Sequence, residues 1–364
     1  MSDLFEKSTI NGMTLRNKFI RSATWEGMAD NDGNCTPELV DMYVSLARGG
    51  IGMIISSHTY IRRDGMGSPR QLGLSDDKFI PGLRKLTDAV HQYDCPIAVE
   101  LSHAGILSNP AVSGLTPLIL SKVEGFPGSE GREMSVEDIK QISTDFGDAA
   151  RRAKEAGFDA IQVHGAHGFL VNQMLSPAFN KRSDDYGGSI ENRTRAIIEI
   201  LSSIRSSVGS DFPILIKMNS EDLLDDGLKP EDSVAAALMI EAAGIDAIEL
   251  SGGTVITGAH CPQDIDTEEK EARWKKSAKL FKAKLGVPLI LVGGIRSLPV
   301  CEKLHAGGYA DYFSLSRPLI REPGLIGRWA AGDTSKASCL SDTLCRGPLM
   351  DGKGIYCVVD ENRT

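Results

Sequence analysis

The chain has 364 residues, of which 41% are hydrophobic and 24% are charged, and its formal net charge is −9. A chain of this length and composition suits a globular protein with a large core, often as one α/β barrel. The negative charge and the lack of any Lys/Arg-rich stretch argue against a nucleic-acid partner, because phosphate binding needs a basic face.

The location of the protein is predicted from three features. No segment reaches the ~18 consecutive apolar residues of a membrane span, and the first residues, MSDLFEKSTINGM, lack the apolar core of a signal peptide. Seven cysteines are too few for a disulfide scaffold in a chain of this size. We therefore expect a cytoplasmic protein that acts on a small molecule, away from membranes, and leave open whether it forms a homo-oligomer.

Short apolar runs alternate with longer amphipathic segments along the chain, as strands and helices do in α/β proteins. We expect eight strands, over Phe19–Ala23, Gly52–Ser56, Ile97–Leu101, Ala160–Val163, Ile214–Met218, Ala247–Leu250, Leu289–Val292 and Tyr312–Leu315. We expect helices between them, over Glu38–Ala47, Pro81–Gln92, Val136–Ala156, Arg193–Ser206, Ser233–Ala243, Glu271–Lys284 and Leu298–Ala306. This alternation predicts an α/β fold, a (β/α)₈ TIM barrel. An open doubly wound sheet is the alternative, but the chain lacks the Gly-rich dinucleotide turn typical of that fold.

The domain organisation follows from the same pattern. Residues 1–333 are expected to form a single barrel domain, and residues 334–364 a short C-terminal extension. Long inserts follow the third strand, at Ile106–Gly131, and the sixth strand, at Gly252–Glu268. Both inserts are expected at the face of the barrel where substrate pockets are built.

Two histidines lie at the end of the fourth strand. The strand runs into His164, and His167 follows in a glycine-flanked turn. Ligands of barrels bind at the carboxyl ends of the strands, and two imidazoles there can donate convergent hydrogen bonds to one carbonyl or oxyanion. The spacing predicts that His164 and His167 are catalytic; a pair of structural histidines is the alternative.

The ends of the last two strands suggest an anion site. The seventh strand ends in Gly293 and Gly294, and the eighth in Ser316 and Arg317. Loops after these two strands commonly bind phosphate in barrels, and backbone N–H groups with an arginine suit that anion. The alternative is that the glycines only make turns.

The fifth strand directs Lys217 toward the barrel interior near its carboxyl end. A buried lysine is costly unless an anion pairs with it. The partner is either a ligand or an internal carboxylate such as Glu249 or Asp222.

The longest distinctive motif surrounds the two histidines. From residue 158 to residue 195 the chain reads FDAIQVHGAHGFLVNQMLSPAFNKRSDDYGGSIENRTR. This segment resembles the signature of the Old Yellow Enzyme family, the FMN-dependent NAD(P)H:flavin oxidoreductases and ene-reductases. The resemblance covers most of the chain, roughly Leu4 to Trp329. It implies FMN at the barrel mouth, NAD(P)H as reductant, and hydride transfer to an activated substrate of the α,β-unsaturated carbonyl type.

The resemblance also implies roles for individual residues. Lys217 would lie near flavin N1 and O2, where reduced flavin carries negative charge, and Arg317 would hold the phosphate. The full set of implied cofactor-binding residues is Ser22, Ala23, Thr24, Glu100, Lys217, Gly293, Gly294, Ser316 and Arg317.

The chain departs from the family pattern at the flavin and beside it. The family usually has glutamine where Glu100 stands, and a glutamate repels flavin O2 unless it is protonated. Trp25 occupies the position that tunes flavin O4, and His58 stands where small residues are usual.

The most consequential departure is Phe169, because versions of the motif with tyrosine at this position use it to donate the proton that completes alkene reduction. A phenyl ring has no proton to donate. His58, Tyr60 or water would have to serve instead. The expected substrate pocket therefore contains Trp25, His58, Tyr60 and Phe169.

These departures keep other functions open. One is a flavin oxidoreductase with a different outcome, such as demethylation, dehydrogenation or enoyl-CoA-type reduction. Another is a flavin-binding protein with little turnover.

The cysteines near the C-terminus, Cys339, Cys345 and Cys357, resemble part of the iron–sulfur segment of the 2,4-dienoyl-CoA reductases. Asp342 stands where the second of the four cysteines would be expected. A relic that has lost its cluster is the favoured interpretation. A cluster with Asp342 as a ligand and a zinc site on the three cysteines are the alternatives.

Overall fold

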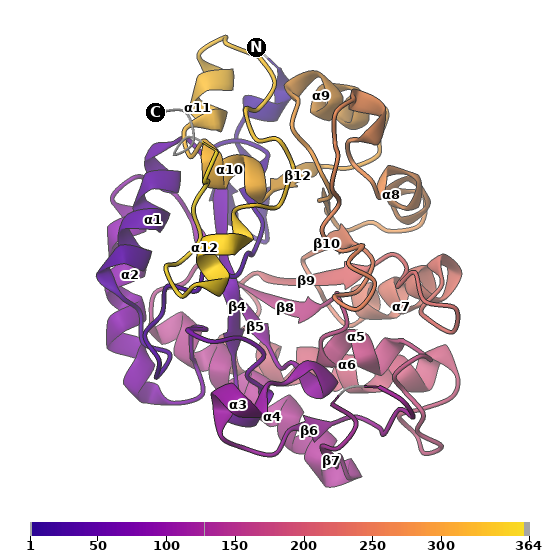
Figure 1. Cartoon of the computed structure of the whole chain (residues 1–364). Helices are drawn as coiled ribbons and strands as arrows, with labels where there is room; N and C mark the ends of the chain where they lie inside the picture. The colour runs from indigo at the N-terminus through magenta and orange to yellow at the C-terminus, as the bar shows by residue number, and fades with distance from the viewer. Residues whose placement is uncertain (1, 127, 360–364) are drawn as a thin grey trace.

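A computed structural model describes residues 2–126 and 128–359. Eight parallel strands close into a barrel in the spatial order β10-β11-β12-β3-β4-β5-β8-β9 (Figure 1). These strands are β3 (Phe19–Arg21), β4 (Met53–Tyr60), β5 (Ile97–Ser102), β8 (Ala160–Gly165), β9 (Ile214–Asn219), β10 (Ala247–Ser251), β11 (Leu289–Leu291) and β12 (Tyr312–Leu315). The predicted (β/α)₈ barrel is confirmed, and each expected strand overlaps an observed one.

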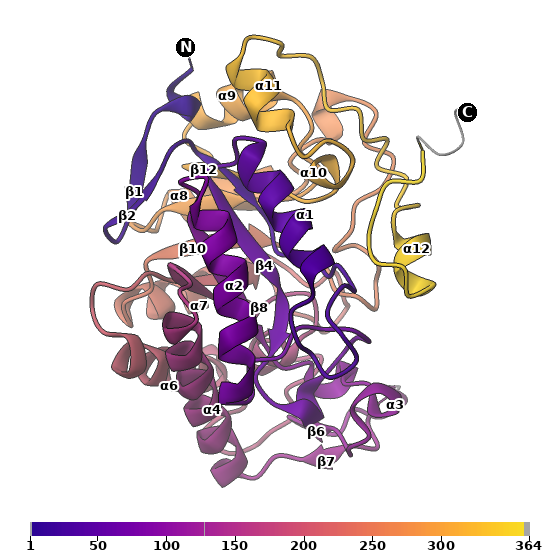
Figure 2. The same cartoon turned by 90° about the vertical axis from the view of Figure 1, so that its left-hand side faces the viewer.

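Helices surround the barrel because each has one apolar face that packs against the strands. The helices that alternate with strands are α1 (Pro37–Arg48), α2 (Ile80–His91), α4 (Val136–Glu155), α6 (Ile190–Val208), α7 (Pro230–Ala242), α8 (Lys275–Lys282), α9 (Leu298–Ala306) and α10 (Arg317–Arg321). Figure 2 shows α1, α2 and α4 following one another around the outside.

One helix is shorter than expected. The sequence predicts a helix from Glu271, but α8 begins only at Lys275. The Glu271 carboxylate accepts hydrogen bonds from the backbone N–H groups of Arg296 and Ser297 and from the Ser297 hydroxyl. This contact holds the loop before α9, so Glu271 belongs to that loop rather than to the helix.

The amino end of the barrel is closed by a hairpin that the strand pattern missed. Strands β1 (Ser8–Ile10) and β2 (Met13–Leu15) pair antiparallel through Asn11 and Gly12, which have φ of 40° and 78° as a two-residue hairpin turn requires. Ile10 and Leu15 are buried in the same cluster as the apolar side chains of the barrel interior. Each strand has three residues, too few for a visible alternation.

The remaining elements are short. They are α3 (Pro110–Ser113), β6 (Leu118–Ile119), β7 (Arg132–Glu133), α5 (Leu170–Leu175), α11 (Leu325–Ala330), α12 (Arg346–Met350) and 3₁₀ turns at Asp3–Phe5, Arg63–Gly65, Asp77–Phe79, Gly105–Leu107 and Glu268–Lys270. The segment with α12 packs back onto the barrel: Leu349 and Ile355 share a buried cluster with Trp25 and Met28. The domain boundary at residue 333 stays a prediction. None of the described helices combines the length and apolar character needed to span a membrane.

Candidate active site

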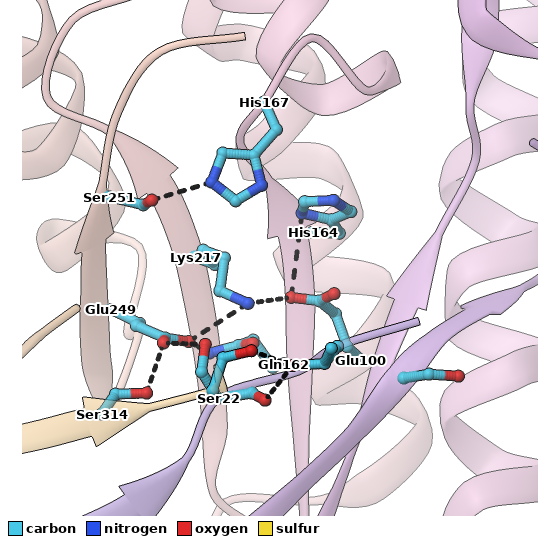
Figure 3. Close-up of polar contacts among 12 residues, drawn as sticks. Ser22, Glu100, Gln162, His164, His167, Lys217, Glu249, Ser251 and Ser314 are labelled. Carbon is cyan, nitrogen blue, oxygen red and sulfur yellow. Dashed lines mark hydrogen bonds and ion pairs between the residues drawn. The ribbon is translucent and has the colours of Figure 1, made fainter. Parts of the chain in front are cut away.

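Polar side chains gather inside the carboxyl end of the barrel, around Lys217 (Figure 3). Neighbouring strands bring them into register: His164 of β8 and Glu249 of β10 both pair with Lys217 of β9. Glu100 of β5 lies two strands away and reaches Lys217 across the barrel interior. The close packing of inward-pointing side chains in one layer of a barrel brings these groups together.

Lys217 is held between two carboxylates. Its Nζ lies 2.9 Å from Glu100 Oε2 and 3.5 Å from Glu249 Oε2, and all three side chains are buried. Burial alone would lower the pKa of Lys217, but the two carboxylates outweigh it and raise that pKa above its usual value. The internal partner left open by the sequence therefore exists, and it is Glu249 together with Glu100. Asp222 instead accepts hydrogen bonds from the side chains of Asn172 and Asn219.

The two carboxylates differ in their partners. Glu249 accepts hydrogen bonds from the Ser22 and Ser314 hydroxyls, both at 2.7 Å, and from Gln162 Nε2 at 2.8 Å. Glu100 accepts one hydrogen bond from Lys217, and its next polar neighbour is His164 Nδ1 at 3.7 Å. Burial raises the pKa of Glu100 to about 7, against the opposing effect of Lys217.

The two predicted histidines lie together above this cluster (Figure 3). Their ring centroids are 5.5 Å apart, and His167 Nε2 lies 2.8 Å from the Ser251 hydroxyl. His167 adopts a left-handed φ of 63°, and its backbone N–H donates to Asn219 Oδ1. Burial, with neighbouring cations and imidazoles, lowers the pKa of both histidines well below the usual value. Both rings are therefore neutral near pH 7 and can donate N–H without carrying charge.

Phe169 and His58 pack beside His164. The Phe169 ring centroid lies 4.3 Å from that of His164 and 5.3 Å from that of His58. Burial and the charge of Lys217 lower the pKa of His58 to about 4. A neutral imidazole is a hydrogen-bond donor but a weak acid, so His58 does not replace a tyrosine proton donor in the resting site.

Tyr60 requires a correction, because the structure does not bring it to the pocket. Its hydroxyl donates to the carbonyl of Asp32, and its ring packs edge-on against Phe79, outside the barrel. Trp25 lies at the rim, where its indole N–H donates to the carbonyl of Pro69.

The predicted phosphate end is built by the adjacent strands β11 and β12. Gly293 and Gly294 have φ of 126° and 76°, but a side chain on Gly293 would also meet Trp274, so packing alone explains that glycine. Arg317 donates to the carbonyls of Pro262 and Ser341. It thereby joins the insert after β10 to the C-terminal segment.

The segment after β3 connects both ends of the site. Ser22 donates to Glu249, and the Thr24 hydroxyl lies 2.8 Å from that of Ser316. Ala23 packs against the apolar cluster inside the barrel.

The C-terminal cysteines form no metal site within the described part of the chain. Across residues 2–126 and 128–359, no three His, Cys, Asp or Glu side chains are arranged to hold a metal ion. Cys345 is the N-cap of α12, Cys339 accepts from the Ser341 N–H, and Cys357 lies 3.9 Å from an Arg321 nitrogen. Burial raises the pKa of Cys345 to about 11, so its thiol is protonated. The residues present do not fit an iron–sulfur cluster or zinc, and we derive no chemistry from either.

Sequence reasoning missed two neighbours of the histidines. Ser251 ends β10, and the His260 ring lies 5.4 Å from that of His167. The only available signal for His260 was its place in the insert after the sixth strand.

The chain matches the model of the NADH:flavin oxidoreductase / NADH oxidase family over residues 3–335. It is 36% identical over 325 residues to the NADH oxidase of Thermoanaerobacter brockii, covering 88% of this chain and 50% of that protein. It is 34% identical over 326 residues to the NADPH dehydrogenase of Clostridium acetobutylicum, covering 89% of this chain and 93% of the relative.

Among solved structures, 2-naphthoyl-CoA reductase in complex with 2-naphthoyl-CoA superposes with a TM-score of 0.88 at 28% identity. That similarity covers 98% of this chain and 56% of the reductase. The chain thus spans about half the length of some relatives and nearly the full length of others.

Proposed function

The chain belongs to the NADH:flavin oxidoreductase / NADH oxidase family, and on that premise we propose that it is an FMN-dependent NAD(P)H oxidoreductase whose substrate is an α,β-unsaturated carbonyl compound. The observation that carries the proposal is the pair of neutral imidazoles, His164 and His167, above the buried Lys217. Two neutral donors beside a fixed positive charge suit a ligand with an acceptor oxygen and developing negative charge.

The residues of the site fit FMN. Lys217 would supply a positive charge for the pyrimidine edge, and Arg317 with the β11 and β12 ends would supply donors for the phosphate. The buried Nδ1 of His164 has no hydrogen-bond partner among the described residues, so the pocket offers an unsatisfied polar group to a ligand. When bound, FMN accepts hydride from NAD(P)H and delivers it to the substrate.

The remaining steps belong to side chains of this chain. His164 and His167 hold the substrate carbonyl and stabilise the negative charge that develops on its oxygen. Ser251 orients the His167 ring through the 2.8 Å contact. Phe169 excludes water from one side but supplies no proton, so we assign the proton to solvent.

The Phe169 assignment predicts a gain of activity. Phe169→Tyr should raise the rate of cyclohexenone reduction at least about tenfold, because a positioned general acid contributes roughly 10²–10⁴-fold. Reduction of the flavin by NAD(P)H should be unchanged. Stopped-flow measurement of the two half-reactions separates these rates, and Phe5→Tyr, at the opposite end of the barrel, is the matched control. An unchanged enone rate in Phe169→Tyr would contradict solvent as the slow donor.

Arg317 offers a test of the phosphate site. Arg317→Met should weaken FMN binding about tenfold to 100-fold, because hydrogen bonds to charged groups contribute roughly 1.5–3 kcal/mol. Affinity for riboflavin, which has no phosphate, should stay the same. Flavin fluorescence titration measures both, and an equal loss for the two flavins would place the phosphate elsewhere.

The proposed function is tested on the purified protein. A bound flavin spectrum, bleaching by NADH or NADPH, and recovery with cyclohexenone support it. A folded protein that takes up no FMN on titration would refute it.

A second candidate function is reduction of an unsaturated acyl thioester. The structural similarity to the solved 2-naphthoyl-CoA reductase covers 98% of this chain and thus extends into the C-terminal segment. An enoyl-CoA substrate in the same stopped-flow experiment distinguishes the candidates: faster flavin recovery with the thioester than with cyclohexenone favours the second.

Location and assembly are further proposals. All seven cysteines are free thiols in the structure, which supports a reducing, cytoplasmic location. Homo-oligomerisation stays a prediction.

A further inference from the structure

The two buried carboxylates beside Lys217 are not equivalent. Glu249 receives three hydrogen bonds in addition to the ammonium of Lys217. Hydrogen bonds to the charged form of a carboxyl group stabilise that form. Among the residues drawn in Figure 3, Glu100 receives a hydrogen bond from Lys217 alone, and His164 Nδ1 lies 3.7 Å away. Of the two, Glu100 is the carboxylate with fewer hydrogen-bond donors.

Several titratable or charged groups face Glu100 from the surrounding elements, and each could in principle take up a proton in its place. They are His58 on β4, His164 on β8, Lys217 on β9, Glu249 on β10 and Glu26 after β3. Burial lowers the pKa of His58 to about 4 and that of His164 further below its usual value, so both stay neutral. Lys217 stays protonated because its pKa is raised.

Glu26 is the competing titratable group. Burial raises its pKa to about 6, and its carboxylate accepts a hydrogen bond from the Tyr43 hydroxyl at 2.7 Å. Tyr43 lies on α1, outside the barrel, and among the described residues Glu26 forms no ion pair with Lys217. Glu100, whose pKa is about 7, is in direct contact with Lys217.

We propose that Glu100 is a redox-linked proton acceptor, which binds one proton from solvent each time the bound cofactor is reduced. The inference rests on the proposed function. NAD(P)H delivers two electrons and one proton as hydride, and this leaves one extra negative charge at the pyrimidine edge. Glu100 takes a second proton from water, so the net charge of the buried site does not change. Lys217 then loses its ion pair with Glu100 and is free to face the new negative charge.

The consequence is a measurable link between pH and reduction potential. Above about pH 7, Glu100 is ionised in the oxidised protein and protonated after reduction, so two protons accompany two electrons. For a two-electron couple, a tenfold change in proton concentration shifts the potential by about 30 mV for each proton taken up. With two protons, the midpoint potential should therefore fall by about 60 mV per pH unit. Glu100→Gln cannot bind the second proton, so its potential should fall by about 30 mV per pH unit.

The experiment is a spectroelectrochemical titration of the FMN-loaded protein between about pH 7 and pH 9. In this range the midpoint potential of the wild type should fall with pH about twice as steeply as that of Glu100→Gln. Glu100→Gln is isosteric and installs the amide usual in the family, so the fold should be preserved. Glu26→Gln is the control and should keep the wild-type slope. Reduced-minus-oxidised infrared spectra should also show a protonated carboxyl C=O band in the wild type that Glu100→Gln lacks.

The outcomes separate this inference from the proposed function. If FMN binds and the wild type shows the shallower slope, Glu100 does not take up the proton and the inference fails alone. If Glu26→Gln, rather than Glu100→Gln, halves the slope, the acceptor is Glu26 and the inference is overturned. If no FMN binds, the proposed function itself fails. A halved slope and a lost infrared band in Glu100→Gln would support the assignment.

Discussion

Lys217→Met is expected to destabilise the apoprotein by about 3–5 kcal/mol, the usual cost of removing one partner from a buried ion pair. The change leaves Glu100 and Glu249 buried without their cation. Isolated carboxylates in a low-dielectric interior are strongly disfavoured. Equilibrium urea unfolding, monitored by circular dichroism, measures the loss, and the variant should also bind FMN weakly.

Two companion variants identify the cause. Lys217→Arg retains a positive charge and should lose much less stability. Adding Glu100→Gln and Glu249→Gln to Lys217→Met removes the uncompensated charges and should recover part of the loss. The same loss in the triple variant would show that packing, rather than charge, stabilises this layer of the barrel.

The stability of Lys217→Met should depend on pH because the pKa of Glu100 is raised. A carboxyl group with a folded pKa of about 7 binds more protons in the folded state than in the unfolded state between about pH 4.5 and pH 7. Its contribution to stability is therefore fully present at low pH and declines as the pH rises through this window. Lys217→Met should accordingly be least stable above pH 7 and should regain stability on acidification.

His164→Ala is expected to lower the rate of enone reduction roughly 10²–10³-fold, the usual cost of removing one donor from an oxyanion site. His164 and His167 are the two donors that converge over Lys217, and both are neutral because burial lowers their pKa values. Flavin reduced chemically with dithionite should be used, so that binding of NAD(P)H does not enter. The rate of flavin reoxidation by cyclohexenone is then the measured quantity.

A histidine outside the site provides the control for His164→Ala. His91 ends α2 and pairs with Asp159 near the amino end of the barrel, so His91→Ala should leave reoxidation unchanged. A loss of less than about tenfold in His164→Ala would exclude His164 as an oxyanion donor. Equal loss with molecular oxygen as oxidant would instead indicate damage to the flavin environment.

The barrel itself was readable from the sequence because its signals are local. Each strand is a short apolar run that ends in a glycine or polar turn, and each helix carries its own apolar face. The nearness of His164 and His167 could be predicted from the sequence for the same reason. Both histidines lie on one strand and the turn that follows it, so their proximity does not depend on the rest of the fold.

The contacts around Lys217 were decided by the tertiary structure. Ser22 and Glu249 are separated by 227 positions in the chain and meet through a 2.7 Å hydrogen bond. That contact exists because the barrel closes and its inward side chains share one layer. The sequence identified Glu249 only as one of two candidate partners for Lys217, and it gave no reason to distinguish the hydrogen bonding of Glu100 from that of Glu249.

The position of Tyr60 was also decided by the tertiary structure, which places it away from the site that the sequence predicted for it. Strict alternation along β4 would put Tyr60 on the same side as His58, but Tyr60 is the last residue of the strand and its hydroxyl donates to the carbonyl of Asp32. The ring of Tyr60 then packs outside the barrel, against Phe79. The sequence by itself determined the fold and the nearness of His164 and His167, because short-range patterns encode them. Only the tertiary structure decided which buried charges meet, because that depends on how distant strands align when the barrel closes.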